Sequence, residues 1–489
     1  MRSAVICWLL LAVLAARLPG QDHCGQAGLP PNHEARLRLA AAGALRSDTL
    51  YQIPAVFHLA ARSDGGSQTP SARVLQALCE LNAQFRPAGI RFFLAPQGIR
   101  QVRSTGIFSQ HHLSASQQAM RSLKADSALN IFVVQNAGPA GESGVTGYFD
   151  PGDDWLVLRR DMLRSGNKTL AHECGHFFGL LHPHFGWDAQ ARTQAGPAPA
   201  LASDGVTATE RMDGSNCQTA GDQLCDTPPD YNNGLGWQQS CQYAGPVQDP
   251  AGQPLDPDET LIMSYFNDSC RAVFSPQQQA LMRAGLSLPD RAHLRGQTPG
   301  DTLPAGQPVL LLPADTVRYM GDSIRFSWHP AAGAAGYIVE ADRSASFSLD
   351  PQEWLLADTS AWLAAAWLPN QTYYWRVWAY HPGHTCTPAS PVQTFVPAPV
   401  PAGLDPAAAP PAVRVWQDGR RLHLQLLQPV PANGALILSD LSGRVLMRQG
   451  LIPQAAPQTL AWDLGHLAPG WYFLRVQGGK SMHVTIQLR

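Results

Sequence analysis

The chain has 489 residues, too many for one hydrophobic core, so we expect several domains. Lys and Arg (35) nearly balance Asp and Glu (37), the net charge is −2 and no basic block is present, which argues against nucleic acid as a partner. Only 15% of the residues are charged, whereas Gly (43) and Pro (41) are abundant, as is typical of a loop-rich, β-rich exported protein.

The first 20 residues are predicted to be a secretory signal peptide. Arg2 supplies the positive start, and the apolar run from Val5 to Ala16 is too short to span a bilayer comfortably. We find no other segment with the length and apolarity of a transmembrane helix, so we expect a secreted or cell-surface protein. Export leads to an oxidising compartment that permits disulfides, and eight of the nine cysteines lie beyond this signal.

Residues 21–50 are weakly patterned, and we assign them to an N-terminal prosegment. Alternating strands and helices follow, so residues 51–290 are predicted to form one α/β (α+β) domain. The predicted strands are 53–60, 90–94, 129–134, 147–149 and 155–158. The predicted helices are 72–85, 168–181 and 276–286, with loops at 187–260.

The predicted helix at 168–181 carries the most informative segment, which reads H-E-C-G-H-F-F-G-L-L-H from His172 to His182. His172 and His176 are four residues apart, so both imidazoles leave one face of the helix and can bind one tetrahedral zinc ion. Gly179 tolerates positive φ, so the chain can turn there and bring His182 back as a third ligand. Three protein ligands leave one coordination position for water, which is typical of a catalytic zinc site.

Glu173 lies beside these histidines, close enough to act on a metal-bound water. The alternative is a buried helix whose histidines are merely hydrogen-bonded, but the glycine and the third histidine at fixed offsets argue against it. Cys174 points away from the face shared by the histidines, and we interpret it as a small buried hydrophobe.

Two all-β domains are predicted after this α/β domain. A Pro/Gly-rich linker at 291–308 precedes short strands separated by turns at 309–396. A second linker at 397–411, mostly Pro and Ala, precedes a last all-β segment at 412–489. We therefore expect a multidomain protein, with an α/β catalytic domain followed by two all-β sandwich domains.

The histidine motif, together with Met263-Ser264-Tyr265 downstream, resembles that of metzincin zinc metallopeptidases, with Met263 as the Met-turn. Within the metzincins the chain is most similar to the pappalysin (cytophagalysin-like) family, over about residues 51–286. The stretches that carry this likeness are 129–133 ahead of the 147–148 strand, 215–229, and 268–270 followed by 274–278.

The resemblance implies a zinc endopeptidase with a metzincin-like catalytic domain. The zinc ligands would be His172, His176 and His182. Glu173 would be the general base, which then passes the proton to the leaving amine. Tyr265 would donate to the oxyanion of the tetrahedral intermediate, unless it is only a packed core tyrosine. Met263 would be a hydrophobic floor under the zinc, and the strand at 147–149 would pair with an extended substrate.

The resemblance also implies a calcium site in the loop region, whose oxygen ligands would be Asp222, Asp226 and Thr227. The alternative is a plain turn with solvated carboxylates. Two disulfides are implied, Cys217 with Cys241 and Cys225 with Cys270, although sequence alone does not determine the pairing. Asp268 could favour a basic substrate side chain, and the neutral Ser269 beside it leaves this open.

Cys24 is a candidate latency switch. Several metzincin zymogens place a thiolate from the N-terminal segment on the open zinc position, and Cys24 lies in the predicted prosegment. Cleavage after Arg36, Arg38 or Arg46 would release it. The alternative is that Cys24 forms a disulfide or has no such role.

The two β domains carry resemblances of their own. Residues 309–396 resemble a fibronectin type III module, through Trp328, Tyr337 and the strand at 374–377. Residues 412–489 resemble the C-terminal sorting domain of type IX secretion substrates, through 438–445 and 467–476. This second likeness implies that the secretion machinery recognises the C-terminal domain and carries the chain across an outer membrane.

We therefore predict a secreted, zinc-dependent endopeptidase that is made as a latent precursor and acts on protein or peptide substrates. One alternative is a cell-surface adhesin built on an inactive peptidase domain, but Glu173 and all three histidines are present. The other is a zinc hydrolase acting on a non-peptide bond, against which the edge strand and the Met-turn argue.

Overall fold

The computed structural model describes residues 23–24, 30, 32–42, 49–138, 144–232, 237–238, 241–300, 305–314, 318–320, 323–349, 351–398, 413–418, 421–426, 435–440, 444–451, 458–468, 470–477 and 482–488. The predicted signal peptide and nearly all of the 397–411 linker lie outside these residues. The chain forms two compact units, Met1–Pro399 and Val400–Arg489. None of the described helices is long and apolar enough to cross a membrane.

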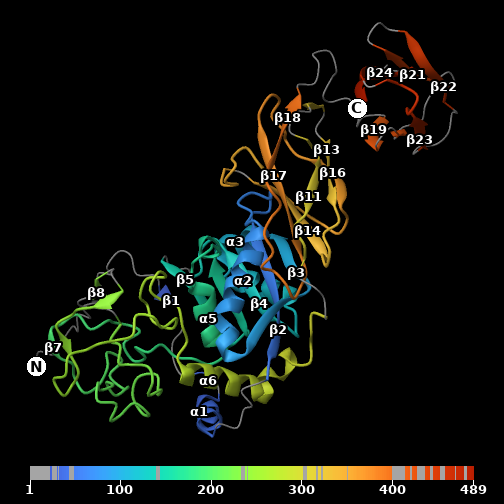
Figure 1. Ribbon diagram of the computed structural model, residues 1–489. Helices are drawn as coiled ribbons and strands as arrows, with labels where there is room; N and C mark the ends of the chain where they lie inside the picture. Colours follow the sequence, from blue (N-terminus) through green and yellow to red (C-terminus); the bar gives the residue numbers. More distant parts are fainter. Residues whose placement is uncertain are drawn as a thin grey trace, which may run out of the picture. The chain divides into compact units, whose positions relative to one another are not determined.

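A six-stranded mixed sheet lies at the centre of the α/β region, in the order β1-β5-β6-β4-β2-β3 (Figure 1). Its strands are β1 (His23–Cys24), β2 (Tyr51–Ala61), β3 (Ile90–Arg103), β4 (Leu129–Val134), β5 (Val145–Asp150) and β6 (Trp155–Arg159). Strands β3, β2, β4 and β6 are parallel, whereas β5 runs antiparallel to β6. All six residues of β4 are buried, as expected for a parallel strand covered on both faces.

Helices cover both faces of this sheet. One layer contains α2 (Ala72–Phe85) and α5 (Thr169–Phe177), and the other contains α3 (Thr105–Gln110) and α4 (Ser114–Leu123). Because side chains alternate along a strand, Phe57 and Leu59 of β2 join the α2/α5 core, whereas Ala60 joins the α3/α4 core. Helix α6 (Pro276–Ser287) extends the first core, and α1 (His33–Ala41) packs against α6. Three short 3₁₀ helices are η1 (Arg86–Ala88), η2 (Arg160–Met162) and η3 (Pro289–Leu294).

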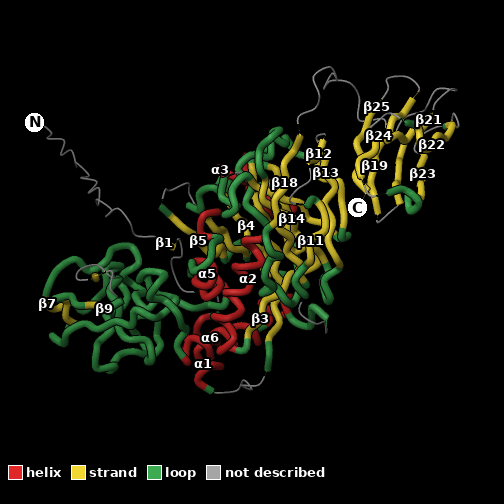
Figure 2. The backbone as a smooth tube through the Cα atoms, turned by 45° about the horizontal axis from the view of Figure 1, so that its top comes forward, coloured by secondary structure: helices red, strands yellow, loops and turns green. Residues whose placement is uncertain are grey.

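A loop-rich lobe, residues 187–260, follows α5 and consists mainly of turns (Figure 2). Its strands are two residues long: β7 (Gly196–Pro197) pairs with β10 (Val247–Gln248), and β8 (Trp237–Gln238) pairs with β9 (Gln242–Tyr243). Two disulfides stabilise this region, but the predicted pairing is wrong. Cys217 bonds to Cys225 and Cys241 bonds to Cys270, because consecutive turns bring the Cα atoms of the first pair to 5.0 Å.

The rest of the first unit is a β-sandwich. One sheet has the order β11-β13-β16 and the other β12-β18-β17-β14-β15. Its strands are β11 (Val309–Leu312), β12 (Arg318–Met320), β13 (Ser323–His329), β14 (Gly336–Asp342), β15 (Gln352–Leu356), β16 (Ser360–Ala364), β17 (Tyr373–Tyr380) and β18 (Gln393–Ala398). Phe326 and Trp375, from opposite sheets, lie in its core with ring centroids 5.0 Å apart.

The second unit consists of two antiparallel sheets, β19-β20-β23 and β22-β21-β24-β25. Its strands are β19 (Val413–Asp418), β20 (Arg421–Leu426), β21 (Ala435–Asp440), β22 (Val445–Gly450), β23 (Gln458–Asp463), β24 (Gly470–Gln477) and β25 (Met482–Leu488). Leu424 and Leu438, from different sheets, lie in one hydrophobic core. The chain is therefore multidomain, with a mixed α/β region followed by β-sheet domains, as the sequence predicts.

Candidate metal centre

The predicted metal-binding segment begins on α5, which is shorter than expected. The sequence predicts a helix up to residue 181, but α5 ends at Phe177 because Gly179 has a φ of +97°, which glycine adopts without strain. The backbone N–H of Leu180 donates to the carbonyl of Gly175 (3.0 Å) and closes this turn. His182 therefore comes from the loop beyond the helix.

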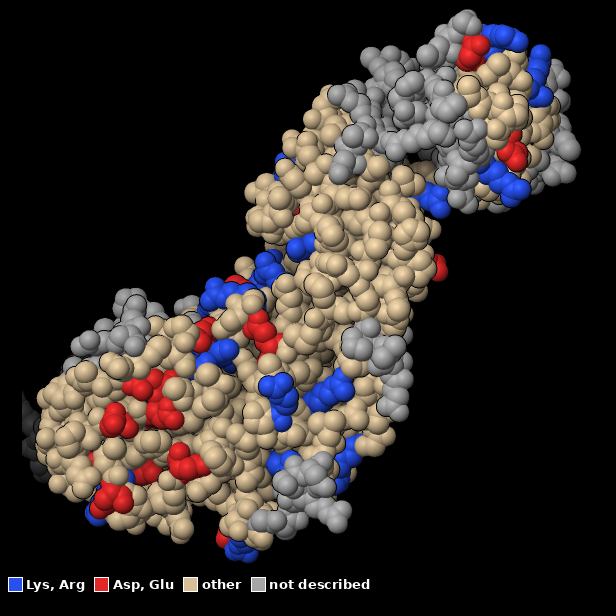
Figure 3. Space-filling view, in the orientation of Figure 1, with Lys and Arg blue, Asp and Glu red and all other residues tan. Residues whose placement is uncertain are grey.

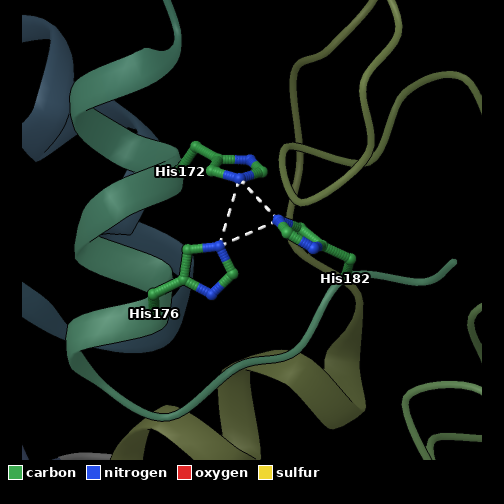
Figure 4. A group of neighbouring side chains, drawn as sticks. All are labelled: His172, His176 and His182. Atoms are coloured by element: carbon green, nitrogen blue, oxygen red, sulfur yellow. Dashed lines mark hydrogen bonds between the residues drawn. The ribbon is translucent and has the colours of Figure 1, made fainter. Parts of the chain in front are cut away.

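Three imidazoles converge at this turn (Figure 4). The Nε2 atom of His172 lies 3.2 Å from that of His176, and the Nε2 atom of His182 lies 3.1 and 3.0 Å from these two. None of the three side chains is more than 2% exposed. Nitrogen ligands of tetrahedral zinc, at their usual bond length, lie about 3.3 Å apart, so the triangle has the size that zinc requires.

The other ring nitrogens determine the tautomers. The Nδ1 atom of His172 lies 2.9 Å from the carbonyl oxygen of Ile262, and that of His176 lies 2.9 Å from the carbonyl oxygen of Leu180. A carbonyl oxygen has no proton, so each Nδ1 must donate, and the Nδ1 of the third imidazole donates to the carboxylate of Asp188. The three Nε2 lone pairs therefore point at one another, an arrangement that is favourable only around a cation.

The protonation state agrees with this geometry. Burial, followed by the neighbouring imidazoles, lowers the pKa of His172 and His176, and burial also lowers the pKa of His182. All three rings are therefore neutral near pH 7, and neutral imidazole is the form that binds a metal. A buried set of three nitrogen donors fits zinc.

Two glycines let other groups come close to α5. A Cβ on Gly147, in strand β5, would lie 3.2 Å from Oε1 of Glu173, so the strand passes directly over this carboxylate, which is 1% exposed. A Cβ on Gly175 would lie 2.3 Å from the sulfur of Met263, which is fully buried against the helix. Cys174 is a buried free thiol in the core, as predicted.

Tyr265 lies beside the same histidines. Its ring centroid is 4.9 Å from that of His182 and 5.8 Å from that of His172. The structure therefore brings together all six residues predicted for the catalytic centre: His172, Glu173, His176, His182, Met263 and Tyr265.

Sequence reasoning assigned no part of the metal site to Asp188 or His184. Asp188 binds His182 through Oδ1 and accepts the backbone N–H of Gly186 through Oδ2 (3.0 Å). Burial by itself would raise the pKa of Asp188, but the neighbouring His182 and His184 hold this pKa well below its usual range. His184 is fully buried and stacks on His182, with 4.6 Å between the ring centroids. An acidic residue six positions after the third histidine is the only sequence signal for Asp188.

Sequence reasoning also missed Arg271. This residue connects the segment around Ile262 with the start of α5. Its guanidinium donates to the carbonyl of Ile262 (3.3 Å), which is the group that orients His172, and to Asp268 (2.6 Å). Asp268 in turn accepts the backbone N–H of Lys168 (3.0 Å) at the start of α5. Asp268 is therefore already paired, and its charge is not available to favour a basic substrate side chain.

The three residues predicted to bind calcium make their contacts in two different places. Asp222 is 1% exposed, and the hydroxyl of Thr227 donates to it (2.8 Å). Asp226 instead accepts the hydroxyl of Ser275 (2.7 Å) and the backbone N–H of Gln277 (2.8 Å), both at the start of α6. The structure thus keeps Asp222 and Thr227 together and gives Asp226 a role in capping α6.

Glu210 is a second buried carboxylate in this part of the lobe. A Cβ on Gly221 would lie 2.4 Å from its Oε2, which has no hydrogen-bond partner within the described part of the chain. Burial, followed by the charge of Asp222, raises the pKa of Glu210 to about 9, and burial raises that of Asp222 to about 7. Residues 187–270 contain twelve Asp and Glu but only Arg192 and Arg211 as basic residues, and acidic side chains gather on this lobe (Figure 3).

The backbone of Cys24 lies near the candidate centre. Strand β1 pairs in parallel with β5, so that Cys24 is opposite Gly147. Helix α1 follows and holds Arg36, one of the predicted cleavage points, in a buried position. Arg36 is 2% exposed, donates to the carbonyl of Phe178 (2.7 Å) and forms an ion pair with Asp290 (3.0 Å). Arg46 lies outside the described residues.

Comparisons with known proteins point to metalloproteases. No protein-family model matches the chain. It is 26% identical over 249 residues to an extracellular metalloprotease of Colletotrichum graminicola, which covers 47% of this chain and 74% of that protein. It is 24% identical over 286 residues to an extracellular metalloprotease of Verticillium alfalfae, which covers 54% of this chain and 84% of that protein. The chain is a distant relative of extracellular metalloproteases.

Solved structures show only weak likeness. The FN1–FN3 domains of chicken CNTN1 match with a TM-score of 0.19 and 14% identity, over 38% of this chain and 69% of that one. A two-domain fibronectin type III segment of chicken tenascin matches with a TM-score of 0.14 and 12% identity, over 38% of this chain and 99% of that one. TM-scores this low do not assign a fold to any part of the chain.

Proposed function

We propose that this protein is a secreted, zinc-dependent endopeptidase of the metzincin type, most similar to the pappalysins. The observation that carries the proposal is the convergence of three Nε2 lone pairs, from His172, His176 and His182, in a buried site whose Nδ1 atoms all donate elsewhere. The similarity to extracellular metalloproteases supports the same class of reaction.

Each residue then has a definite role. When bound, zinc supplies Lewis acidity, which makes water a nucleophile near neutral pH. Glu173 accepts a proton from the attacking water and delivers it to the leaving amine. Tyr265 donates a hydrogen bond from its hydroxyl to the oxygen on which negative charge develops. Once the N-terminal segment with β1 has left, strand β5 offers its edge to an extended substrate, and Gly147 lets that strand lie directly over Glu173.

Casein cleavage by the purified, processed protein tests this proposal. We expect hydrolysis that 1,10-phenanthroline abolishes and added zinc restores. Protein that binds one zinc ion but cleaves neither casein nor gelatin would favour a binding protein built on an inactive peptidase domain. Activity that persists after all metal is removed would contradict a zinc mechanism.

We also propose that calcium binds between the two buried carboxylates of the lobe, with Asp222 and Glu210 as its charged ligands and Thr227 beside them. Two carboxylates in one buried place are stabilised by a hard cation with oxygen ligands. The sequence predicted Asp226 for this role, and its contacts with Ser275 and Gln277 argue that Glu210 takes its place.

Calcium at about 100 times its dissociation constant should stabilise the fold by roughly 2.7 kcal/mol. EGTA should therefore lower the melting temperature while zinc stays bound, and Asp222→Asn or Glu210→Gln should remove this sensitivity. Asp226→Asn is the matched control, which should remain sensitive to EGTA. A calcium response equal in all three variants would contradict this ligand set.

The N-terminal segment is proposed to keep the precursor latent. Strand β1 occupies the edge of β5 that a substrate would use, with Cys24 opposite Gly147 and therefore close to Glu173. We expect Cys24→Ala to make the unprocessed chain active against casein, whereas Cys174→Ala, which removes a buried thiol elsewhere, should leave it latent. An inactive unprocessed Cys24→Ala variant would reject the switch.

We also propose that the two C-terminal segments act in export and at the cell surface. The resemblances of residues 309–396 to a fibronectin type III module and of residues 412–489 to a type IX sorting domain suggest an adhesion module and a signal for the secretion machinery. Deleting 412–489 should leave the chain inside the producing cell, which immunoblots of medium and cell fractions would detect; equal secretion without this segment would reject the sorting role.

A further inference from the structure

Strand β14 of the sandwich is buried along its whole length, Gly336 to Asp342. In a two-sheet sandwich one face of each sheet normally meets solvent, so alternate residues should be exposed. Val339 faces the sandwich core, as expected. Ile338 is fully buried in the core of the α/β domain instead, and Trp378, its partner on β17, is buried in the same core. The outer face of this sheet therefore completes the core of the neighbouring domain.

Hydrogen bonds cross the same contact. The carboxylate of Glu353, on β15, accepts the backbone N–H groups of Ser71 (2.7 Å) and Ala72 (3.0 Å) at the start of α2. Ser71 makes no side-chain cap of its own, so the sandwich supplies the capping acceptor that α2 lacks. The backbone N–H of Leu94, on β3, also donates to the carbonyl of Pro382 (2.9 Å).

A disulfide joins the two domains at the same helix. Cys79, within α2, bonds to Cys386, in the segment after β17, across a sequence separation of 307 residues. A crosslink over so long a loop restricts the unfolded chain strongly. Neither the capping contact nor this bond is compatible with a sandwich that moves freely on a linker.

Helix α2 in turn packs against α5, the helix that carries His172 and His176. Ala77 and Leu81 of α2 face Leu170 and Ala171 of α5 around a small cavity, and His172 follows directly on α5. We propose that the β-sandwich is a permanent part of the zinc domain, which holds α2 in place and through it the zinc helix, rather than a spacer. This inference rests on the packing and on the proposed zinc site, but it does not depend on the proposed peptidase activity.

The test uses the full chain with Cys386→Ser and, separately, Glu353→Ala. Hydrogen–deuterium exchange should show faster exchange of residues 71–85 in both variants, and zinc release on heating should begin about 5–10 °C lower without the disulfide. Asp358→Ala, an exposed carboxylate close to Glu353 in sequence, is the control and should match the wild type. Both readouts measure structure, so they remain informative if the protein cleaves no substrate.

A cleavable connection provides the second test. A specific protease site placed at 301–304 should leave the cut protein as one species that retains zinc, whereas Cys386→Ser should let the cut halves separate and the α/β half lose zinc. Unchanged exchange in α2, or an α/β half that keeps zinc and its melting temperature after separation, would overturn the proposal.

Discussion

Replacing Glu173 with Gln should lower kcat/KM for casein by roughly 10²–10⁴-fold, while zinc content and melting temperature stay near those of the wild type. Gln has the shape of Glu but cannot accept the proton from the attacking water. The side chain is 1% exposed and lies between α5 and β5, where it is shielded from bulk solvent. Peptide hydrolysis, zinc content by atomic absorption and thermal melting measure the three quantities.

Two controls separate chemistry from folding in this experiment. Asp161→Asn changes an exposed carboxylate that pairs with Arg159 on the surface, and it should leave kcat/KM unchanged. His182→Ala should lose both zinc and activity. Activity of the Glu173→Gln variant within tenfold of the wild type would exclude Glu173 as the general base.

Replacing Gly179 with Ala in the unprocessed chain should destabilise the protein by at least about 3 kcal/mol and abolish stoichiometric zinc binding. Two effects add. At a φ of +97° an alanine is strained, and its Cβ would lie 1.9 Å from the Nη1 atom of Arg36. Arg36 would have to leave a buried position in which it binds the carbonyl of Phe178 and the carboxylate of Asp290. Urea unfolding and zinc titration measure both outcomes.

Gly166 provides the matched comparison. Its φ of +79° is similarly unfavourable for alanine, but no atom lies within 4 Å of the added Cβ, so Gly166→Ala should cost only about 1–2 kcal/mol and leave zinc bound. The difference between the two variants isolates the contact with Arg36. Equal destabilisation by both substitutions would show that this contact contributes nothing to the turn.

The convergence of the three histidines could be predicted from sequence because the information is local. His172 and His176 share a helix face through their i, i+4 spacing, and Gly179 permits the turn that returns His182. The six-residue strand at 129–134 and the helix at 72–85 were likewise predicted with the bounds that the structure has, since apolar periodicity within one segment defines each. The helix at 168–181 was predicted too long, because its apolar pattern continues past the residue at which the backbone turns.

The partners of these residues could not be predicted, because they depend on contacts between distant segments. Ile262 and Asp188 orient the imidazoles, Arg271 holds the carbonyl of Ile262, and no spacing rule connects them to the motif. The disulfide pairing failed for the same reason: several pairings satisfy one cysteine count, and only the path of the turns brings Cys217 to Cys225.

By itself the sequence determined the cluster of three histidines and the order of an α/β region followed by β-sheet domains, since each is encoded in a continuous stretch of residues. Only the tertiary structure decided that the β-sandwich packs against the α/β domain and is crosslinked to it. Ile338 in a strand has the same local pattern whether it faces solvent or a core, and Cys79 has no local sign of its partner 307 residues away. Burial and crosslinking are properties of the folded chain, because they arise where segments meet in space.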